Sequence, residues 1–204
     1  MTEEIGIQLA RERADYEACV DLQRAVWGMA DVEVTSVIQF VATVHAGGMV
    51  HLARTAAGRA VGFTYAFASL RDEPHLHSDL LAVLPEYQGQ GVGARLKWAQ
   101  RDEALARGVK RISWTFDPLQ ARNANLNLRR LGAVATAFHE NFYGVTASFL
   151  HHGMPTDRLE VHWELGSETV RSLQQQGEPP RSAPALRGSV SAGCRRGRKA
   201  LRPG

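Results

Sequence analysis

A glycine-rich segment at residues 88–93 separates an apolar, strand-like stretch from a helical pattern in the middle of the chain. Its three glycines allow positive φ values and let the backbone approach a ligand closely. The free N–H groups of the first helical turn, with the helix dipole behind them, favour a bound anion. The segment therefore predicts a strand-to-helix turn that holds phosphate, such as a pyrophosphate.

Two common nucleotide-binding motifs do not fit the spacing of this segment. A P-loop needs Lys followed by Ser or Thr after its last glycine, whereas Gly93 is followed by Ala94 and Arg95. A dinucleotide fingerprint needs G-x-G-x-x-G early in a βαβ unit, whereas these glycines run G-x-G-x-G after more than 80 other residues. The glycine pattern alone is also compatible with a turn whose only role is tight packing.

The rest of the sequence mixes strand-like and helix-like patterns in an order that defines the fold class. We predict strands at residues Ile5–Leu9, Met49–Thr55, Ala60–Ser69, 76–84, 111–117 and 159–165. We predict helices at residues 15–27, 35–46, 94–107 and 123–131. Helices that interrupt runs of strands, without strict βαβ repetition, predict an α/β domain of the α+β kind.

Length and composition predict one domain followed by a tail. With 204 residues and 44% hydrophobic content, the chain is long enough for one well-buried core and short for two. We place the domain at residues 1–166 and a basic tail at residues 167–204. From about residue 177 the tail is rich in Gly, Pro, Ser, Ala and Arg, which predicts disorder.

The net charge of +3 does not indicate a nucleic-acid partner, because the charge is segregated. From Gly177 onward there are seven basic residues and one acidic residue, while the remainder has 17 basic and 20 acidic residues. A nucleic-acid groove needs its basic excess on the folded body. Nucleic-acid binding through the arginine-rich tail is therefore only a minor alternative.

The sequence predicts a cytoplasmic protein without a membrane partner. Cys19 and Cys194 lie at opposite ends, as suits a reducing compartment, and the N-terminus lacks the pattern of a secretion signal. No apolar run reaches the roughly 18 residues that a membrane span needs. The histidine pairs at residues 75 and 77 and at 151–152 have no third ligand at useful spacing, so we predict no metal site.

Two motifs resemble signatures of the GNAT superfamily of N-acyltransferases. Residues 81–93, Leu-Ala-Val-Leu-Pro-Glu-Tyr-Gln-Gly-Gln-Gly-Val-Gly, resemble its acyl-CoA-binding strand, turn and helix start, with Gln88, Gly91 and Gly93 at the motif positions. Residues 123–133 resemble its second signature, a helix that begins with Asn and ends at Leu-Gly-Phe. The resemblance covers residues 5–165 and is strongest to a bacterial subgroup of predicted acyltransferases.

The resemblance implies a fold and a co-substrate. It implies a mixed, mostly antiparallel sheet of about six or seven strands flanked by about four helices, with central strands splayed around acyl-CoA. The co-substrate would be acetyl-CoA or another acyl-CoA, such as succinyl-CoA, with its pantetheine along the central strand and its pyrophosphate at the glycine turn. The residues assigned to acyl-CoA in this way are Leu81, Ala82, Val83, Gln88, Gly89, Gln90, Gly91, Val92, Gly93, Asn123 and Asn127.

Acyl transfer to an amine needs a base for the amine proton and benefits from an acid for the leaving thiolate. The resemblance implies a Tyr acid at position 128, where this chain has Leu128. Tyr143 is the substitute if its strand returns towards the thioester. Strand alternation places His77 and Asp79 on one face beside the expected cofactor, so either can be the base, although both can also be solvated residues.

The resemblance implies transfer of an acetyl or succinyl group to the primary amine of a small molecule such as an amino acid, in a ternary complex. Glu33, between the first two helices, and Arg158 are candidates for binding that substrate, although Arg158 can equally form a surface ion pair. The missing tyrosine leaves open a non-catalytic acyl-CoA-binding or sensor domain. The apolar strand at residues 159–165 can pair within the chain or with a second subunit in a homodimer.

Overall fold

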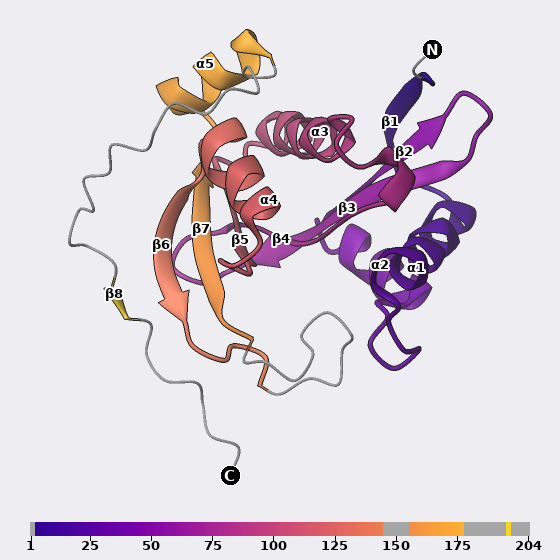
Figure 1. Cartoon of the computed structure of the whole chain (residues 1–204), viewed down its shortest axis with the longest axis horizontal. Coiled ribbons are helices and arrows are strands. Elements are labelled where there is room, and N and C mark those ends of the chain that lie inside the picture. Colours follow the sequence, from indigo (N-terminus) through magenta and orange to yellow (C-terminus); the bar gives the residue numbers. More distant parts are fainter. Residues whose placement is uncertain (1–2, 145–155, 178–194, 197–204) are drawn as a thin grey trace.

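The computed structural model of the chain describes residues 3–144, 156–177 and 195–196, and its strands form one mixed sheet with helices on both faces (Figure 1). The sheet order is β1-β2-β3-β4-β5-β7-β6-β8. The strands are β1 (Ile5–Leu9), β2 (Met49–Thr55), β3 (Ala60–Ser69), β4 (His75–Val83), β5 (Arg111–Phe116), β6 (Val134–His139), β7 (Arg158–Glu164) and β8 (Arg195–Arg196). Residues 151–152 and most of the basic tail lie outside the described residues.

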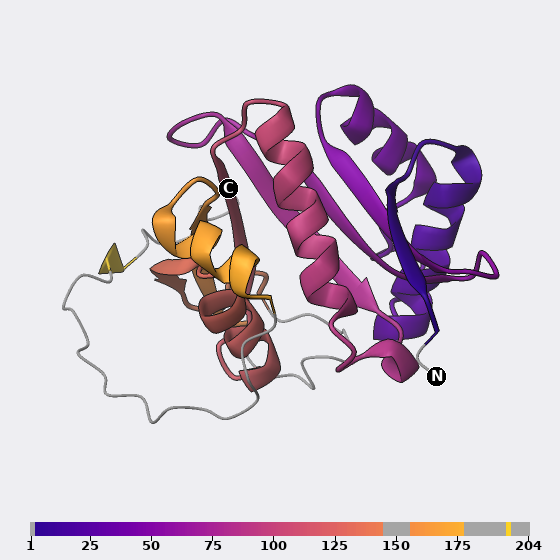
Figure 2. The same cartoon turned by 90° about the horizontal axis from the view of Figure 1, so that it is seen from above.

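The helices divide between the two faces of the sheet (Figure 1). They are α1 (Arg13–Trp27), α2 (Val37–His45), α3 (Val92–Ala106), α4 (Ala121–Ala124), which continues into a π-helical segment (Asn125–Arg130), and α5 (Glu168–Gln176). Helix α3 lies over the middle of the sheet, between β1 on one side and α4 and α5 on the other (Figure 2). Helices α1 and α2 cover the opposite face at its N-terminal strands, and no described helix covers that face at β5, β7 and β6 (Figure 1).

Two hydrophobic clusters form the core. One packs α1, α2 and the start of α3 against β2, β3 and β4, with Phe40 and Phe63 fully buried. The other lies under α3, α5 and the π-helical segment, where Trp163 is fully buried and its indole Nε1 donates to the Leu131 carbonyl at 2.6 Å. Helix α3 contributes to both clusters and thereby joins them.

Strands β4 and β5 pair in parallel over only two positions. Leu76 pairs with Ile112 and His77 pairs with Ser113, and beyond these residues the two strands separate. All other pairs among β1 to β7 are antiparallel. The mixed, mostly antiparallel sheet and the splayed central strands that we expected are therefore confirmed.

Strand β7 lies between β5 and β6 and pairs with both. The sequence left open whether residues 159–165 pair within the chain or with a second subunit, and the pairing within the chain is the one that forms. The sequence reading also missed two elements, β6 and α5. Helix α5 is capped by Ser167, whose hydroxyl accepts from the Val170 N–H at 3.3 Å, and Val170 is buried in the second cluster.

Candidate active site

The N-terminus of α3 lacks a side-chain cap. Gly91, with φ 82°, is the N-cap residue and makes no side-chain hydrogen bond, and Gly89 also has a positive φ of 77°. The first N–H groups of a helix have no partner within it, so those of Val92, Gly93 and Ala94 remain available. By contrast, Ser36 caps α2 with its hydroxyl. The glycine turn thus presents free donors and the positive end of a dipole to an anion.

Gln88 fastens this turn to its neighbours. Its side-chain Nε2 donates to the Val83 carbonyl at 2.9 Å, which ties the turn to the end of β4. Its Oε1 accepts from Nη1 of Arg122 at 2.6 Å, which brings a guanidinium from α4 beside the turn. The sequence reading did not single out Arg122, because its contact with the turn depends on how α4 folds back towards β4.

The edge of β4 that faces β5 is unpaired beside this turn. Leu81, Ala82 and Val83 pair with β3 on one side and have no partner on β5. Gly93 lies next to this edge, since a Cβ atom built on it would lie 3.8 Å from Val83 Cγ2 and 4.0 Å from Leu126 Cδ2. The structure therefore places the residues expected to bind pantetheine next to those expected to bind pyrophosphate, where β4, α3 and the π-helical segment meet.

Asp79 is the extra residue of a β-bulge in β4. Tyr65 of β3 pairs with Leu80 and Ala66 pairs with Ser78, which leaves Asp79 without a partner. The Asp79 side chain is exposed, yet desolvation by the surrounding protein raises the pKa of its carboxyl. Our expectation that Asp79 shares a face with His77 assumed strict alternation, which the bulge interrupts.

His77 lies where β4 and β5 begin to separate. Its ring is partly buried and packs 5.2 Å from the Phe67 ring, between centroids. Its Nδ1 lies 3.1 Å from the Ser113 hydroxyl oxygen. Burial lowers the pKa of His77 to about 4, and Glu160 only partly opposes this shift. The ring is therefore neutral at pH 7 and able to accept a proton.

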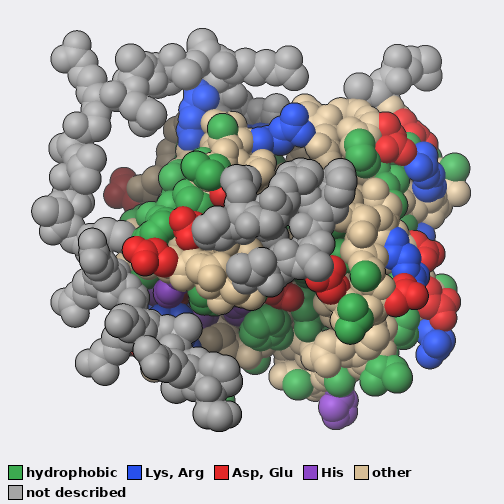
Figure 3. Space-filling model, turned by 60° about the horizontal axis from the view of Figure 1, so that its bottom comes forward, with side chains coloured by type: hydrophobic (Ala, Val, Ile, Leu, Met, Phe, Trp, Pro, Cys, Tyr) green, Lys and Arg blue, Asp and Glu red, His purple; other side chains and the backbone are tan. Residues whose placement is uncertain are grey.

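A polar cluster continues from His77 across the face that no described helix covers. The Glu160 carboxylate lies 2.6 Å from His139 Nε2, 3.3 Å from Arg71 Nη1 and 3.5 Å from His162 Nε2. Although burial alone would raise it, the hydrogen bond from His139 and the charge of Arg71 hold the pKa of Glu160 below its ordinary value. Histidine side chains gather on this face of the molecule beside acidic and basic groups (Figure 3).

Lys97 is buried on the opposite face of the sheet, behind β4. Its Nζ donates to Ser78 Oγ and to Gln100 Oε1, both at 2.8 Å, and lies 3.9 Å from the centroid of the Trp114 ring. Complete burial lowers the pKa of Lys97 well below its ordinary value. Through Ser78 this amine supports the strand next to the bulge.

We predict that Lys97→Met flattens the dependence of stability on pH. Because the folded pKa of Lys97 is depressed, the unfolded chain binds more protons between that pKa and 10.5, and stability rises with pH in this window. From pH 7.5 to 9.5 the free energy of unfolding should rise by up to about 2.7 kcal/mol relative to the variant. Urea unfolding measures this, with exposed Lys110→Met as control, and parallel curves for wild type and Lys97→Met would contradict it.

The other residues predicted to bind acyl-CoA or substrate, or to act in catalysis, lie in different parts of the fold. Asn123 is exposed on α4, whereas Asn127 is buried in the π-helical segment. Glu33 is exposed in the loop between α1 and α2. Tyr143 lies beyond the end of β6, outside any strand, with its ring exposed and 5.1 Å from the Arg158 guanidinium carbon. The structure thus joins Tyr143 with Arg158 and places His77 and Asp79 together on β4.

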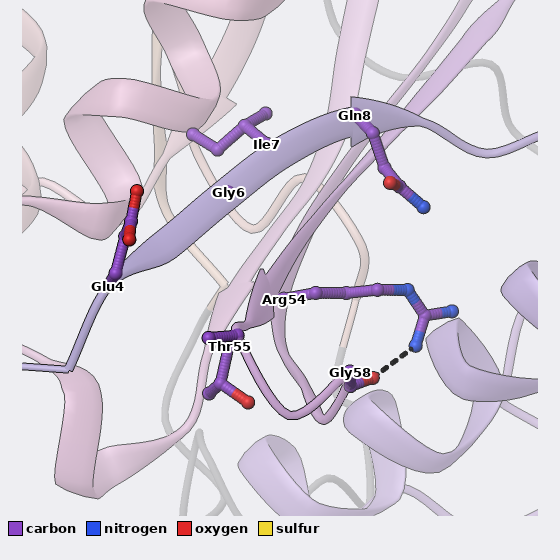
Figure 4. A pocket seen from close by; sticks show the side chains of 8 residues that line it. Glu4, Gly6, Ile7, Gln8, Arg54, Thr55 and Gly58 are labelled. Atoms are coloured by element: carbon purple, nitrogen blue, oxygen red, sulfur yellow. Dashed lines mark hydrogen bonds between the residues drawn. The ribbon is translucent and has the colours of Figure 1, made fainter.

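A hollow elsewhere on the surface crosses β1 and β2 (Figure 4). Arg54, one of its lining residues, already donates to the Gly58 carbonyl and to the Asp15 carboxylate, both at 2.8 Å. Its lining residues include neither the glycine turn nor β4. We therefore do not assign the acyl-CoA site to this hollow.

The family of the chain follows from its sequence over the region that builds this site. Residues 14–133 match the acetyltransferase (GNAT) family, a match that covers more than half of the chain. The chain belongs to the GNAT acetyltransferase family. The matched residues include the glycine turn, β4 and the π-helical segment, so the GNAT resemblance of both motifs is confirmed. A search among curated proteins finds no significant match.

Solved GNAT structures share this fold. Ribosomal-protein-S18-alanine N-acetyltransferase from Escherichia coli is similar with a TM-score of 0.63 and 19% identity, over 80% of this chain and 96% of that one. A GNAT acetyltransferase from Elizabethkingia anophelis, solved with acetyl-CoA bound, has a TM-score of 0.61 and 18% identity, over 78% of this chain and 97% of that one. At these identities the similarity establishes the fold.

The described part of the chain has neither a group of metal-ligating side chains nor a membrane-spanning helix. Within residues 3–144, 156–177 and 195–196, no three histidine, cysteine, aspartate or glutamate side chains are grouped so that they can hold a metal ion. Over the same residues, every helix is too short or too polar to cross a membrane.

Proposed function

We propose that this GNAT acetyltransferase transfers an acetyl group, or a succinyl group, from coenzyme A to the primary amine of a small molecule such as an amino acid. The observation that supports this most directly is that the uncapped glycine N-terminus of α3 lies next to the unpaired edge of β4. The helix N-terminus offers donors to a pyrophosphate, and the strand edge offers backbone groups to a pantetheine amide and a thioester carbonyl.

In this proposal the residues of the glycine turn and of the unpaired edge of β4 hold the acyl-CoA. The N–H groups at residues 88–93 bind the pyrophosphate, Arg122 adds positive charge beside them, and the backbone of residues 81–83 binds the pantetheine. Asn123 and Asn127 lie on the helical segments next to the turn and complete this region. The bound acyl-CoA supplies an activated thioester, so the protein need only place and deprotonate the amine.

The acceptor amine attacks the thioester carbon, so that a C–N bond forms and the C–S bond breaks. His77 takes the proton from the amine, and a proton is returned to the CoA thiolate. Asp79 is the second candidate for the base, since desolvation raises its pKa towards neutral pH. Tyr143, with an exposed ring, is the candidate acid, while Glu33 and Arg158 are candidates for binding the acceptor. We place the enzyme in the cytoplasm.

Calorimetric titration with acetyl-CoA, succinyl-CoA and ATP tests the first part of the proposal. We expect a CoA ester to bind and ATP to bind more weakly, because ATP lacks the pantetheine that pairs with β4. Lack of binding by either ester, or a preference for ATP, would contradict an acyltransferase. A subsequent screen of primary amines with the bound ester distinguishes an enzyme from an acyl-CoA sensor, since only the enzyme releases free CoA in response to an amine.

A further inference from the structure

Three side chains form a continuous hydrogen-bonded chain that ends at His77. The Glu73 carbonyl lies 2.6 Å from His75 Nδ1, His75 Nε2 lies 2.9 Å from Ser113 Oγ, and Ser113 Oγ lies 3.1 Å from His77 Nδ1. His75 and Ser113 are both buried. The parallel pairing of His77 with Ser113 holds the hydroxyl between the two rings. The chain is thus fixed by the last pair of residues before β4 and β5 separate.

The Glu73 carbonyl determines the direction of each hydrogen bond between these side chains. A backbone carbonyl can only accept, so Nδ1 of His75 carries a proton. When the His75 ring is neutral, its Nε2 is then an acceptor, and it takes the single hydroxyl proton of Ser113. The Ser113 oxygen can only accept from His77, so Nδ1 of His77 must donate. The remaining nitrogen of His77, Nε2, therefore holds a lone pair.

We propose that His75 and Ser113 are positioning residues that lock His77 in the tautomer protonated on Nδ1, so that its Nε2 can accept the proton of the acceptor amine. Among residues 3–144 and 156–177, His77 Nε2 has no hydrogen-bond partner. It is therefore available to a substrate. This inference rests on the proposed function for its role in catalysis, but the tautomer itself can be measured without any substrate.

The charged groups around His77 leave this arrangement intact at neutral pH. Burial is the largest influence on the pKa of His77 and lowers it, as do Lys97, Arg71 and, when it is protonated, His75, while Glu160 raises it. A neutral ring has one proton to place, and the Ser113 oxygen is the acceptor available to it. Asp79, the other titratable side chain close by on β4, is two residues away and makes no hydrogen bond to the ring among the described residues.

The test is the ¹⁵N spectrum of the histidine side chains, in which the two nitrogens of each neutral ring give different shifts according to which one is protonated. The His77 signals are identified by their loss in His77→Gln. In the wild-type protein we expect Nδ1 of His77 to be protonated. Ser113→Ala should shift its tautomer towards Nε2–H, and Ser113→Thr, which keeps the hydroxyl, should preserve it. His75→Leu removes the acceptor of the serine proton and should also shift the tautomer.

A wild-type His77 protonated on Nε2, or a tautomer unchanged in Ser113→Ala, would overturn the proposal whether or not the protein is an acyltransferase. Where turnover is found, Ser113→Ala should lower kcat about 10- to 100-fold, as for partners that fix the tautomer of metal-bound histidines. The KM for acyl-CoA should stay the same, and Ser113→Thr should restore kcat. An increase in KM alone would instead indicate a purely structural role.

Discussion

Replacement of Gly93 by Phe is expected to lower the affinity for acetyl-CoA by at least about 100-fold, or about 2.7 kcal/mol. Gly93 belongs to the first turn of α3, and an added Cβ would be in ordinary contact with Leu81, Val83 and Leu126. A phenyl ring projecting from that Cβ would occupy the space between β4 and the π-helical segment, where the pantetheine is proposed to enter. Calorimetric titration measures the loss directly.

Gly93→Ala is the matched control for this substitution. Because the φ of Gly93 is not positive, a methyl group introduces no backbone strain, and alanine is a better helix former than glycine by up to about 1 kcal/mol. We therefore expect Gly93→Ala to fold with equal or greater stability and to retain most of its affinity. If both variants bound acetyl-CoA as tightly as the wild type, the acyl-CoA site could not lie beside Gly93.

The glycine turn could be predicted from the sequence because its conformation is determined locally. Three glycines next to a helical pattern predict a strand-to-helix turn without reference to distant residues. The positive φ values of Gly89 and Gly91 agree with this prediction. Strands β1 to β5 and helices α1 to α3 were predicted for a similar reason, since each has a clear apolar period or stop signal. The family motifs additionally indicated which of these elements bind acyl-CoA.

The elements that were missed have weak local signals. Strand β6 reads Val-Ala-Thr-Ala-Phe-His, and Val134 within it is exposed, so it lacks a clear apolar face. Helix α5 buries only Val170 and has three consecutive glutamines at its end. Both elements are defined by their neighbours in the fold, which a single sequence does not reveal.

The parts of the candidate site that could not be predicted depend on strand register and on helix packing. On α3 the polar residues Lys97 and Gln100 are buried, which the apolar period of the helix does not indicate. The burial of Lys97 requires the rings of Trp114 and Trp163 from two other strands. The alternation of side chains along β5 and β7 puts polar residues on one face of the sheet. This alternation was the sequence signal that could have predicted the cluster around Glu160.

His77→Gln is expected to lower kcat by about 10²- to 10⁴-fold, the range for loss of a general base, while leaving the affinity for acetyl-CoA unchanged. Glutamine preserves a polar side chain of similar length but cannot take a proton from the amine at neutral pH. A pKa of about 4 makes His77 a weak base, so the effect should fall near the lower end of this range. Steady-state kinetics with the best amine from the screen, together with calorimetry, separate the two effects.

Asp79→Asn is the comparison that decides between the two candidate bases. It keeps the side-chain shape at the bulge and removes the carboxylate, so it should change kcat less than His77→Gln if the imidazole is the base. The pH dependence of kcat/KM provides an independent test. Because burial depresses the pKa of His77 to about 4, titration of His77 should not reduce kcat/KM between pH 8 and about 5. A larger loss in Asp79→Asn, with an acid limb that this variant removes, would transfer the role of base from His77 to Asp79.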